Sequence, residues 1–248
     1  MDILRIGLRY VKEGILFNPV WISEFKLRSH IKPTIESIKI STSERWLDVG
    51  CGLRPYESYF PVGSYVGVDI IEGSGRTPDQ KIPDFFYDGR VLPFPEKSFD
   101  GVISTQVLEH VSDPRNLLAE MYRVIKPGGG LVLSLPFVWP EHEEPYDFLR
   151  FTSFGITELL RQSGFDVESI VKDTGAIEAL AVALNVYIIH NLVPPIRGFG
   201  RLVALGICFP IQFVALILQR ALPDNGQFYL NLVIRARKID LSAQSSLR

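Results

Sequence analysis

One stretch constrains the fold of this chain more than any other: residues 45–60, RWLDVGCGLRPYESYF. A short apolar run reaches an acid, Asp48, and then breaks into Gly-x-Gly at Gly50 and Gly52. The pattern is typical of a buried parallel strand that leaves its sheet through a tight turn, and ligands of open α/β sheets bind at such strand ends. The glycines allow a ligand to approach the backbone closely. Asp48 needs a partner, because a carboxylate near a core is costly to bury alone.

A second acid follows at the end of the next predicted strand, YVGVDI. This acid is Asp69, which lies 19 residues after Gly50, about the spacing at which an acid reaches ribose hydroxyls in a nucleotide-type site. The dinucleotide fingerprint also requires a third glycine, where Pro55 stands here. A nicotinamide oxidoreductase is therefore disfavoured, although an ordinary tight turn also explains Gly-x-Gly taken alone.

The rest of the chain alternates predicted strands and helices. We expect strands at 85–87, 99–104, 131–135, 165–171 and 228–238. A helix should begin after the N-cap Asp113 with Pro114 in its first turn, bury Ile125, and end within the Lys-Pro-Gly-Gly of 126–129. Another helix is expected over 153–162, ending before Gly164.

These motifs together resemble one enzyme family. The Gly-x-Gly stretch, Asp69, FYDGRVLPFPEKSFDGVISTQVLEHVSDP and MYRVIKPGGGLVLSLP stand in the order and spacing of class I S-adenosylmethionine-dependent methyltransferases. The nearest variety is one often found in bacterial glycan and lipid biosynthesis. The resemblance covers residues 45–170 and resumes near Phe228. Two features depart from it: Arg54 replaces a frequent third glycine of the loop, and a long apolar insert precedes the last strand.

The resemblance implies an α/β fold, a Rossmann-like three-layer sandwich with a mostly parallel seven-stranded sheet and one antiparallel strand. It implies S-adenosylmethionine as cofactor, with the methionine part at the glycine loop, the ribose at Asp69 and the adenine at Asp88. An ordinary Asp-Gly turn is the alternative role of Asp88. The predicted cofactor-binding residues are Asp48, Gly50, Cys51, Gly52, Asp69, Ile70, Asp88, Gly89, Thr105 and Gln106.

Two histidines are candidates for catalysis. A hydroxyl acceptor must lose a proton, for which histidine is the usual general base, and His110 and His142 fall near the predicted rim. His110 is equally well explained as a structural residue that holds its turn. The acidic and aromatic loop 136–152, which contains His142, is expected to shape the acceptor pocket, with a solvated face as the alternative. We predict no metal site, because the spacing of His142 and the glutamates has no ligand specificity.

The insert, residues 174–222, contains two apolar segments, 174–195 and 201–222. We expect a helical hairpin that dips into the cytosolic face of a membrane without crossing it, with Arg197, Arg201 and Arg220 at the headgroups. A homodimer interface or a hydrophobic cap on the sheet is the competing hypothesis. The expected organisation of the whole chain is a helical cap (1–43), a cofactor-binding core (44–173), the insert (174–222), the last core strand (223–238) and a tail (239–248).

Composition limits the partners and the compartment. The net charge is −2 and no run of Lys or Arg reaches five, so a nucleic-acid partner is disfavoured. Two cysteines form no disulfide framework, and the charged amino-terminal segment lacks the apolar core of a secretory signal. We expect a cytoplasmic protein, at the inner face of the membrane if the insert binds lipid.

The leading functional hypothesis is O-methylation of a glycan or lipid-linked biosynthetic intermediate. The alternatives are methylation of a small-molecule or quinone-like acceptor, and a non-catalytic module that retains cofactor binding.

Overall fold

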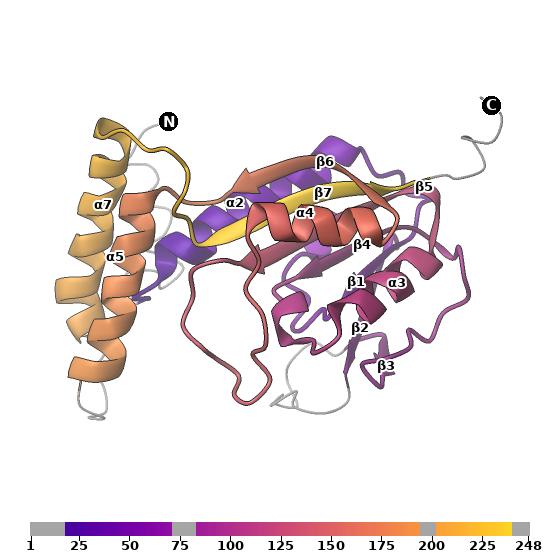
Figure 1. Ribbon diagram of the computed structural model, residues 1–248, viewed down its shortest axis with the longest axis horizontal. Coiled ribbons are helices and arrows are strands. Elements are labelled where there is room, and N and C mark those ends of the chain that lie inside the picture. The colour runs from indigo at the N-terminus through magenta and orange to yellow at the C-terminus, as the bar shows by residue number, and fades with distance from the viewer. Residues whose placement is uncertain (1–17, 71–82, 194–201, 240–248) are drawn as a thin grey trace. The chain divides into compact units, whose positions relative to one another are not determined.

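The computed structural model describes residues 18–70, 83–193 and 202–239 (Figure 1). These residues form two compact units, one built from residues 18–29 and 172–230, the other from 30–171 and 231–239. The helical segment expected before residue 18 and most of the polar loop after Asp69 lie outside the described residues. So do Arg197 and Arg201 between the apolar segments, and nearly all of the tail.

The larger unit contains a seven-stranded sheet in the order β3-β2-β1-β4-β5-β7-β6. Neighbouring strands from β3 to β5 are parallel, and β7 runs antiparallel to β5. The predicted mostly parallel sheet with one antiparallel strand is confirmed. The strands are β1 (Trp46–Val49), β2 (Tyr65–Ile70), β3 (Phe85–Tyr87), β4 (Phe99–Thr105), β5 (Ile125–Pro136), β6 (Phe165–Lys172) and β7 (Asn231–Lys238).

The central strand β1 is buried along its whole length, as parallel strands covered on both faces are. The ring of Trp46 lies against Gly101 of β4 and Gly130 of β5, where an added Cβ would approach its carbons to 2.4 and 2.8 Å. Glycine at these two strand positions therefore makes room for the tryptophan. Strand order reverses between β2 and β4 around β1, which makes the carboxyl end of β1 the topological switch point.

Helices flank this sheet, with α3 and α4 in front of it in Figure 1. The helix α3 begins as predicted, because the Asp113 carboxylate accepts the Asn116 N–H at 3.2 Å. In α4 the hydroxyl of Thr152 accepts the Gly155 N–H at 3.0 Å. The helices are α2 (Trp21–Ile38), α3 (Pro114–Val124) and α4 (Ser153–Gln162), with 3-10 turns at Glu57–Tyr59 and Leu108–His110.

The helix α3 ends at Val124, earlier than predicted. Ile125 is buried as expected, but it is the first residue of β5 and pairs with Phe99. The strand then includes residues 126–130, which we had expected to be the helix terminus and a turn. Pro127 explains the difference, because a residue before proline is disfavoured in the helical region and favours an extended backbone.

The smaller unit contains the apolar insert as two helices that lie side by side (Figure 1). The first is α5 (Ala176–Tyr187), which continues as a π-helical turn at Ile188–Leu192. The second is α7 (Phe209–Ala221), preceded by a π-helical turn at Ala204–Cys208. A helical insert before the last strand is therefore confirmed, whereas the domain boundaries expected from the sequence stay predictions.

Buried polar side chains join residues 18–29 to the two helices. The Asn185 amide donates to the carbonyls of Pro19 at 3.0 Å and Cys208 at 2.9 Å. The fully buried Gln212 amide accepts the Ile22 N–H at 3.0 Å. The Gln212 amide and the Asn185 NH₂ group are thus paired, whereas the buried Asn185 Oδ1 has no hydrogen-bond partner among the described residues. One polar residue in each apolar segment, Asn185 in the first and Gln212 in the second, thus helps to hold the unit together.

Candidate active site

Residues at the carboxyl ends of five adjacent strands lie along one edge of the sheet. The Gly52 N–H donates to the Asp69 carboxylate at 3.0 Å, which links the ends of β1 and β2. The Gln106 N–H donates to the Ser134 carbonyl at 2.9 Å, which links β4 to β5. A Cβ on Gly89 would lie 3.6 Å from Ile70, at the ends of β3 and β2. The structure therefore brings most of the predicted cofactor-binding residues to one rim.

The glycine loop has one tight and one open position. Gly50 has φ +73°, and a Cβ there would lie 2.4 Å from the Val107 side chain. Gly52 has φ +50°, and nothing lies within 4 Å of its would-be Cβ. Both positions favour glycine because side chains rarely adopt a positive φ. Only Gly52 borders space that a ligand can occupy.

The Cys51 side chain points away from that space. It is buried, and a Cβ on Gly67 of β2 would approach its sulfur to 2.8 Å. The N–H groups of Gly50 and Cys51 both donate to the Val68 carbonyl, at 2.9 and 3.2 Å. The loop is thus fixed to β2 through its backbone, and Cys51 contributes packing beneath it.

Asp69 stands where the spacing predicted an acid. One carboxylate oxygen accepts the Gly52 N–H, and the other accepts the Ile70 N–H at 2.8 Å. These two backbone bonds hold the carboxylate at the end of β2, beside the glycine loop. Ile70 follows with a side chain that is 44% exposed, an apolar surface beside the acid.

Asp48 is buried beneath the loop rather than exposed on the rim. Its Oδ2 accepts the Tyr65 hydroxyl at 2.5 Å, which supplies the partner that the sequence demanded. Burial raises the pKa of Asp48 to about 7, against the opposing effect of the Tyr65 hydrogen bond. Among the described residues, Oδ1 has no hydrogen-bond partner. The structure thus shows no open face on Asp48 for direct contact with a cofactor.

Arg54 occupies the loop position where the family resemblance led us to expect glycine, and its φ is +58°. The backbone retains the left-handed conformation that glycine would take, at a cost of about 1–2 kcal/mol for a residue with a side chain. The guanidinium is held by Asp84 at 2.8 Å and Glu57 at 3.0 Å, and it lies over the Tyr65 ring. These contacts explain how arginine is accommodated at this position.

Asp88 forms a turn with its own backbone. Its carboxylate accepts the N–H groups of Arg90 and Val91, both at 2.9 Å, and these bonds hold its pKa below the usual range. Gly89 follows with φ +77°. The Asp-Gly turn considered from the sequence is therefore present, whereas the adenine contact stays a prediction.

Thr105 and Gln106 end β4 on the same rim. Gln106 has φ +54°, and its side-chain amide donates to the Ser134 hydroxyl at 3.2 Å. This second tie to β5 orients the side chain along the edge of the sheet. Thr105 is partly exposed there.

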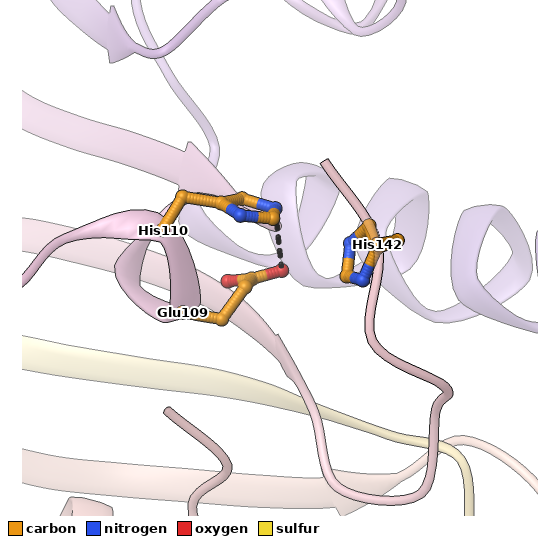
Figure 2. Close-up of side chains that lie close together, drawn as sticks. All are labelled: Glu109, His110 and His142. Carbon is orange, nitrogen blue, oxygen red and sulfur yellow. Dashed lines mark ion pairs between the residues drawn. The ribbon is translucent and has the colours of Figure 1, made fainter. Parts of the chain in front are cut away.

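The two candidate catalytic histidines lie together although 32 residues separate them in the sequence (Figure 2). Their ring centroids are 4.7 Å apart, with the rings nearly perpendicular. The Nδ1 of His110 lies 2.9 Å from the Tyr146 carbonyl, and the Nδ1 of His142 lies 3.0 Å from the Asp147 carboxylate. Each acceptor selects the tautomer with a proton on Nδ1, which leaves the lone pair on Nε2.

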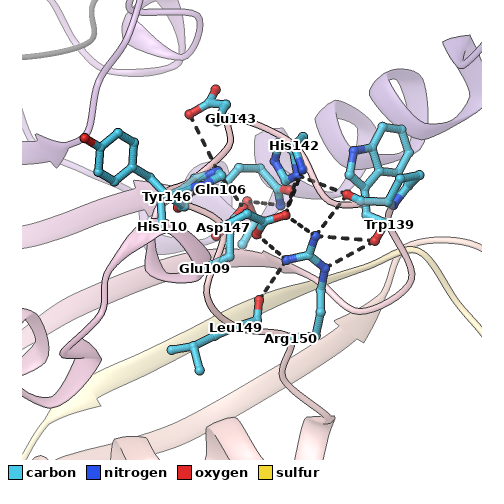
Figure 3. A network of polar contacts seen from close by, with 12 residues as sticks. Gln106, Glu109, His110, Trp139, His142, Glu143, Tyr146, Asp147, Leu149 and Arg150 are labelled. Carbon is cyan, nitrogen blue, oxygen red and sulfur yellow. Dashed lines mark hydrogen bonds and ion pairs between the residues drawn. The ribbon is translucent and has the colours of Figure 1, made fainter. Parts of the chain in front are cut away.

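A salt bridge holds the loop that carries His142 (Figure 3). The Arg150 guanidinium donates to both oxygens of Asp147, at 2.5 and 2.6 Å, and also to the carbonyls of Trp139 and Pro140. Asp147 accepts the His142 N–H at 2.9 Å, and its pKa is held far below the usual range chiefly by Arg150. The loop predicted to shape the acceptor pocket is thus an ordered, bridged structure.

Sequence reasoning missed Glu109, which lies next to the histidine pair. The side chain is fully buried, and among the described residues neither carboxylate oxygen has a hydrogen-bond partner. Burial raises its pKa to about 8. The available signal was the sequence Leu-Glu-His-Val at 108–111, where an acid beside a histidine sits between apolar residues.

Comparison with known proteins identifies the domain. Residues 47–133 match a family model described as a methyltransferase domain. A demethylmenaquinone methyltransferase of Symbiobacterium thermophilum is 31% identical over 149 residues, 54% of this chain and 53% of the relative. One of Geobacillus sp. is 29% identical over 52% of this chain and 63% of its own length. The chain thus spans about half to two-thirds of the length of these curated relatives.

Solved structures agree on the fold. The [4+2]-cyclase SpnF has a TM-score of 0.54 at 19% identity, covering 85% of this chain and 80% of its own. A phosphoethanolamine N-methyltransferase 2 of Haemonchus contortus, solved with S-adenosylhomocysteine, has a TM-score of 0.53 at 18% identity, covering 85% and 53%. Identity at this level shows the fold alone, and a cyclase is among the proteins that share it. Together with the matched family model, it shows that this chain contains a methyltransferase domain, matched over residues 47–133, on a Rossmann-like fold.

Proposed function

We propose that this protein transfers a methyl group from S-adenosylmethionine to a lipid-soluble, quinone-like acceptor. The observation that supports it most is the rim at the switch point. There a glycine loop is fixed to β2 and bordered by open space at Gly52, beside the Asp69 carboxylate. The matched methyltransferase domain spans these same residues.

The residues of the rim fit this cofactor. Asp69 offers acceptors for ribose hydroxyls, the exposed Ile70 offers an apolar surface for a base, and Gly52 allows close approach to the backbone. When bound, the cofactor supplies an already activated methyl group on a sulfonium. The protein's own contribution is orientation of the reactants, which is worth about 7–11 kcal/mol in favourable cases.

The histidine pair supports a role in acceptor chemistry. Both Nε2 atoms carry lone pairs, because each Nδ1 faces an oxygen of the chain. A neutral imidazole with its tautomer fixed in this way can accept the proton of a hydroxyl acceptor. His142 is the better placed, because Arg150 holds its Asp147 partner.

The acceptor class rests on two observations. The two relatives cited above are named demethylmenaquinone methyltransferases, which favours a quinone-like acceptor over the glycan or lipid-linked intermediate first expected from the sequence. The apolar helices α5 and α7 also expose large side chains, including Leu184, Tyr187 and Ile217. An acceptor dissolved in a membrane would suit a protein with such a surface.

The test follows transfer of labelled methyl groups to three sets of acceptors: demethylated quinones, lipid-linked glycans and soluble small molecules. We expect turnover only with the quinones. Turnover with lipid-linked glycans alone would show that the acceptor is a glycan intermediate and not a quinone. Binding of the cofactor without turnover on any of the three sets would favour a non-catalytic module.

We propose further that the insert contacts a membrane from its cytosolic side. Among the described residues, Ala204–Ala221 is the helical stretch long and apolar enough to span a bilayer, with mean hydropathy 1.6 and 28% of it buried. A core helix of a soluble protein would be mostly buried. Arg220 in the last turn of α7 is positioned to meet anionic headgroups.

Flotation with anionic liposomes tests this contact, with a form in which a Gly/Ser linker replaces residues 176–221 as the comparison. We expect the intact protein to float and the shortened form to remain in solution. A soluble intact protein that runs as a dimer, which the deletion dissociates, would assign the apolar surface to a second copy of the chain instead.

A further inference from the structure

Glu109, His110 and His142 form a cluster whose potential ligand atoms all lie within 4.8 Å of one another (Figure 2). We propose that this cluster binds a divalent transition-metal cation, with zinc as the reference ion. The inference does not rest on the methyl-transfer proposal, but a bound cation would take the Nε2 lone pairs of His110 and His142 and so replace the general-base role given to them above.

The carboxylate is the first argument. Glu109 is fully buried beside the histidines, with Oε1 3.9 Å from the Nε2 of His110. Among the described residues, neither of its oxygens receives a hydrogen bond. A buried carboxylate without hydrogen bonds is costly, and coordination to a cation is one of the arrangements that stabilise it.

The histidines supply the second argument. Metal-ligating histidines almost always donate their other ring N–H to a carbonyl or a carboxylate. His110 has the Tyr146 carbonyl at 2.9 Å from Nδ1, and His142 has the Asp147 carboxylate at 3.0 Å from Nδ1. Both Nε2 atoms therefore carry the lone pair, and that of His110 faces Glu109 at 3.9 Å. The Asp147–His142 pair has the form of a carboxylate–histidine–metal triad.

A zinc site requires the three side chains to close on the ion. Zinc binds imidazole nitrogen and carboxylate oxygen at about 2.0–2.2 Å in tetrahedral geometry, which places ligand atoms about 3.3 Å apart. Glu109 and His110 are 3.9 Å apart, and the whole set lies within 4.8 Å, so up to about 1.5 Å of closure by side-chain rotation would bring the three ligand atoms to zinc distances.

A two-histidine, one-carboxylate set leaves a fourth position for water or another oxygen. Glu143, with Oε2 3.8 Å from the Nε2 of His110 and a side chain that is 72% exposed, is close enough to reach that position.

The direct test measures zinc on the full-length protein, first by elemental analysis after purification without chelators and then by competition with a chromophoric chelator. We expect one zinc per chain. Replacement of zinc by Co²⁺ should produce the visible absorption of a four-coordinate cobalt site, without the charge-transfer band of thiolate ligands. Absence of stoichiometric zinc and of this spectrum in the folded protein would overturn the proposal.

Variants assign the site to these residues. Glu109→Gln retains the shape of the side chain, and His142→Gln removes one imidazole. Each should weaken zinc binding at least about 100-fold, whereas His190→Gln, outside the cluster, should leave it unchanged. Circular dichroism and thermal melting confirm that each variant is folded. Folded Glu109→Gln and His142→Gln variants that bind zinc as tightly as His190→Gln would also overturn the assignment.

Discussion

Two loops at the same edge of the sheet are held in place by different means. The glycine loop, residues 50–52, is fixed by backbone N–H groups that donate to Val68 and Asp69 of the neighbouring strand. The loop at 139–150 is fixed by side chains, chiefly Arg150 and Asp147. A backbone-held loop needs the right conformation at a few glycines, whereas a side-chain-held loop depends on particular charged groups. The predictions below exploit this difference.

The buried acid beneath the glycine loop gives the largest expected effect. The pKa of Asp48 is raised by burial to about 7 in the folded protein, whereas an unfolded Asp titrates near 3.8. Between these values the unfolded chain has released the proton that the folded chain still binds, so stability falls as pH rises from 4 to 7. A shift of this size corresponds to at most about 4 kcal/mol.

Asp48→Asn removes that titration and should flatten the pH profile of the unfolding free energy, measured by urea denaturation. The variant should gain most, relative to the native sequence, above pH 7. A constant difference between the two proteins from pH 4 to 8 would contradict the assigned burial effect.

Arg150→Met tests the side-chain-held loop. The substitution leaves the Asp147 side chain without its main partner. Breaking a buried ion pair in this way should lower the free energy of unfolding by about 3 kcal/mol. Turnover should be lost, whereas affinity for S-adenosylmethionine should change little. Arg161→Met, which breaks the exposed pair with Glu158, is the control and should have little effect on stability. If Arg150→Met and Arg161→Met changed stability and turnover equally, Arg150 would not be what holds this loop.

Three glycines with positive φ separate strain from ligand contact. Gly50→Ala should destabilise the protein by about 2 kcal/mol or more, because it adds a steric clash with Val107 to the backbone cost. Gly52→Ala and Gly63→Ala carry the backbone cost alone, since nothing lies within 4 Å of either added Cβ. Only the Gly52 variant should also lose cofactor affinity by calorimetry. If Gly52→Ala and Gly63→Ala bound S-adenosylmethionine equally well, the cofactor would have to bind away from Gly52.

The same difference explains what the sequence predicted. An apolar strand, an acid and Gly-x-Gly form a local sequence pattern that predicts a particular backbone conformation. The sheet and the rim at Gly50, Gly52 and Asp69 could therefore be predicted from it. The proximity of His110 and His142 depends on two loops that meet only in the folded chain, and no spacing encodes it. Glu109 was missed for a similar reason, because its burial without hydrogen bonds is a property of the packed loop.

The early end of α3 shows a local signal that was given too little weight. Pro127 restrains the residue before it, and the pairing of β5 with β4 extends back to Ile125. Tertiary pairing therefore decided the boundary between helix and strand.

The measurement that tests the account most directly is calorimetric titration of S-adenosylmethionine into the native protein, Asp69→Ala and His142→Gln. Loss of a charged hydrogen-bond acceptor costs about 1.5–3 kcal/mol, so Asp69→Ala should weaken binding about 10- to 150-fold. His142→Gln lies in the other loop and should bind the cofactor as the native protein does. Unchanged affinity in a folded Asp69→Ala variant, or an equal loss in His142→Gln, would contradict the separation of a cofactor loop from an acceptor loop.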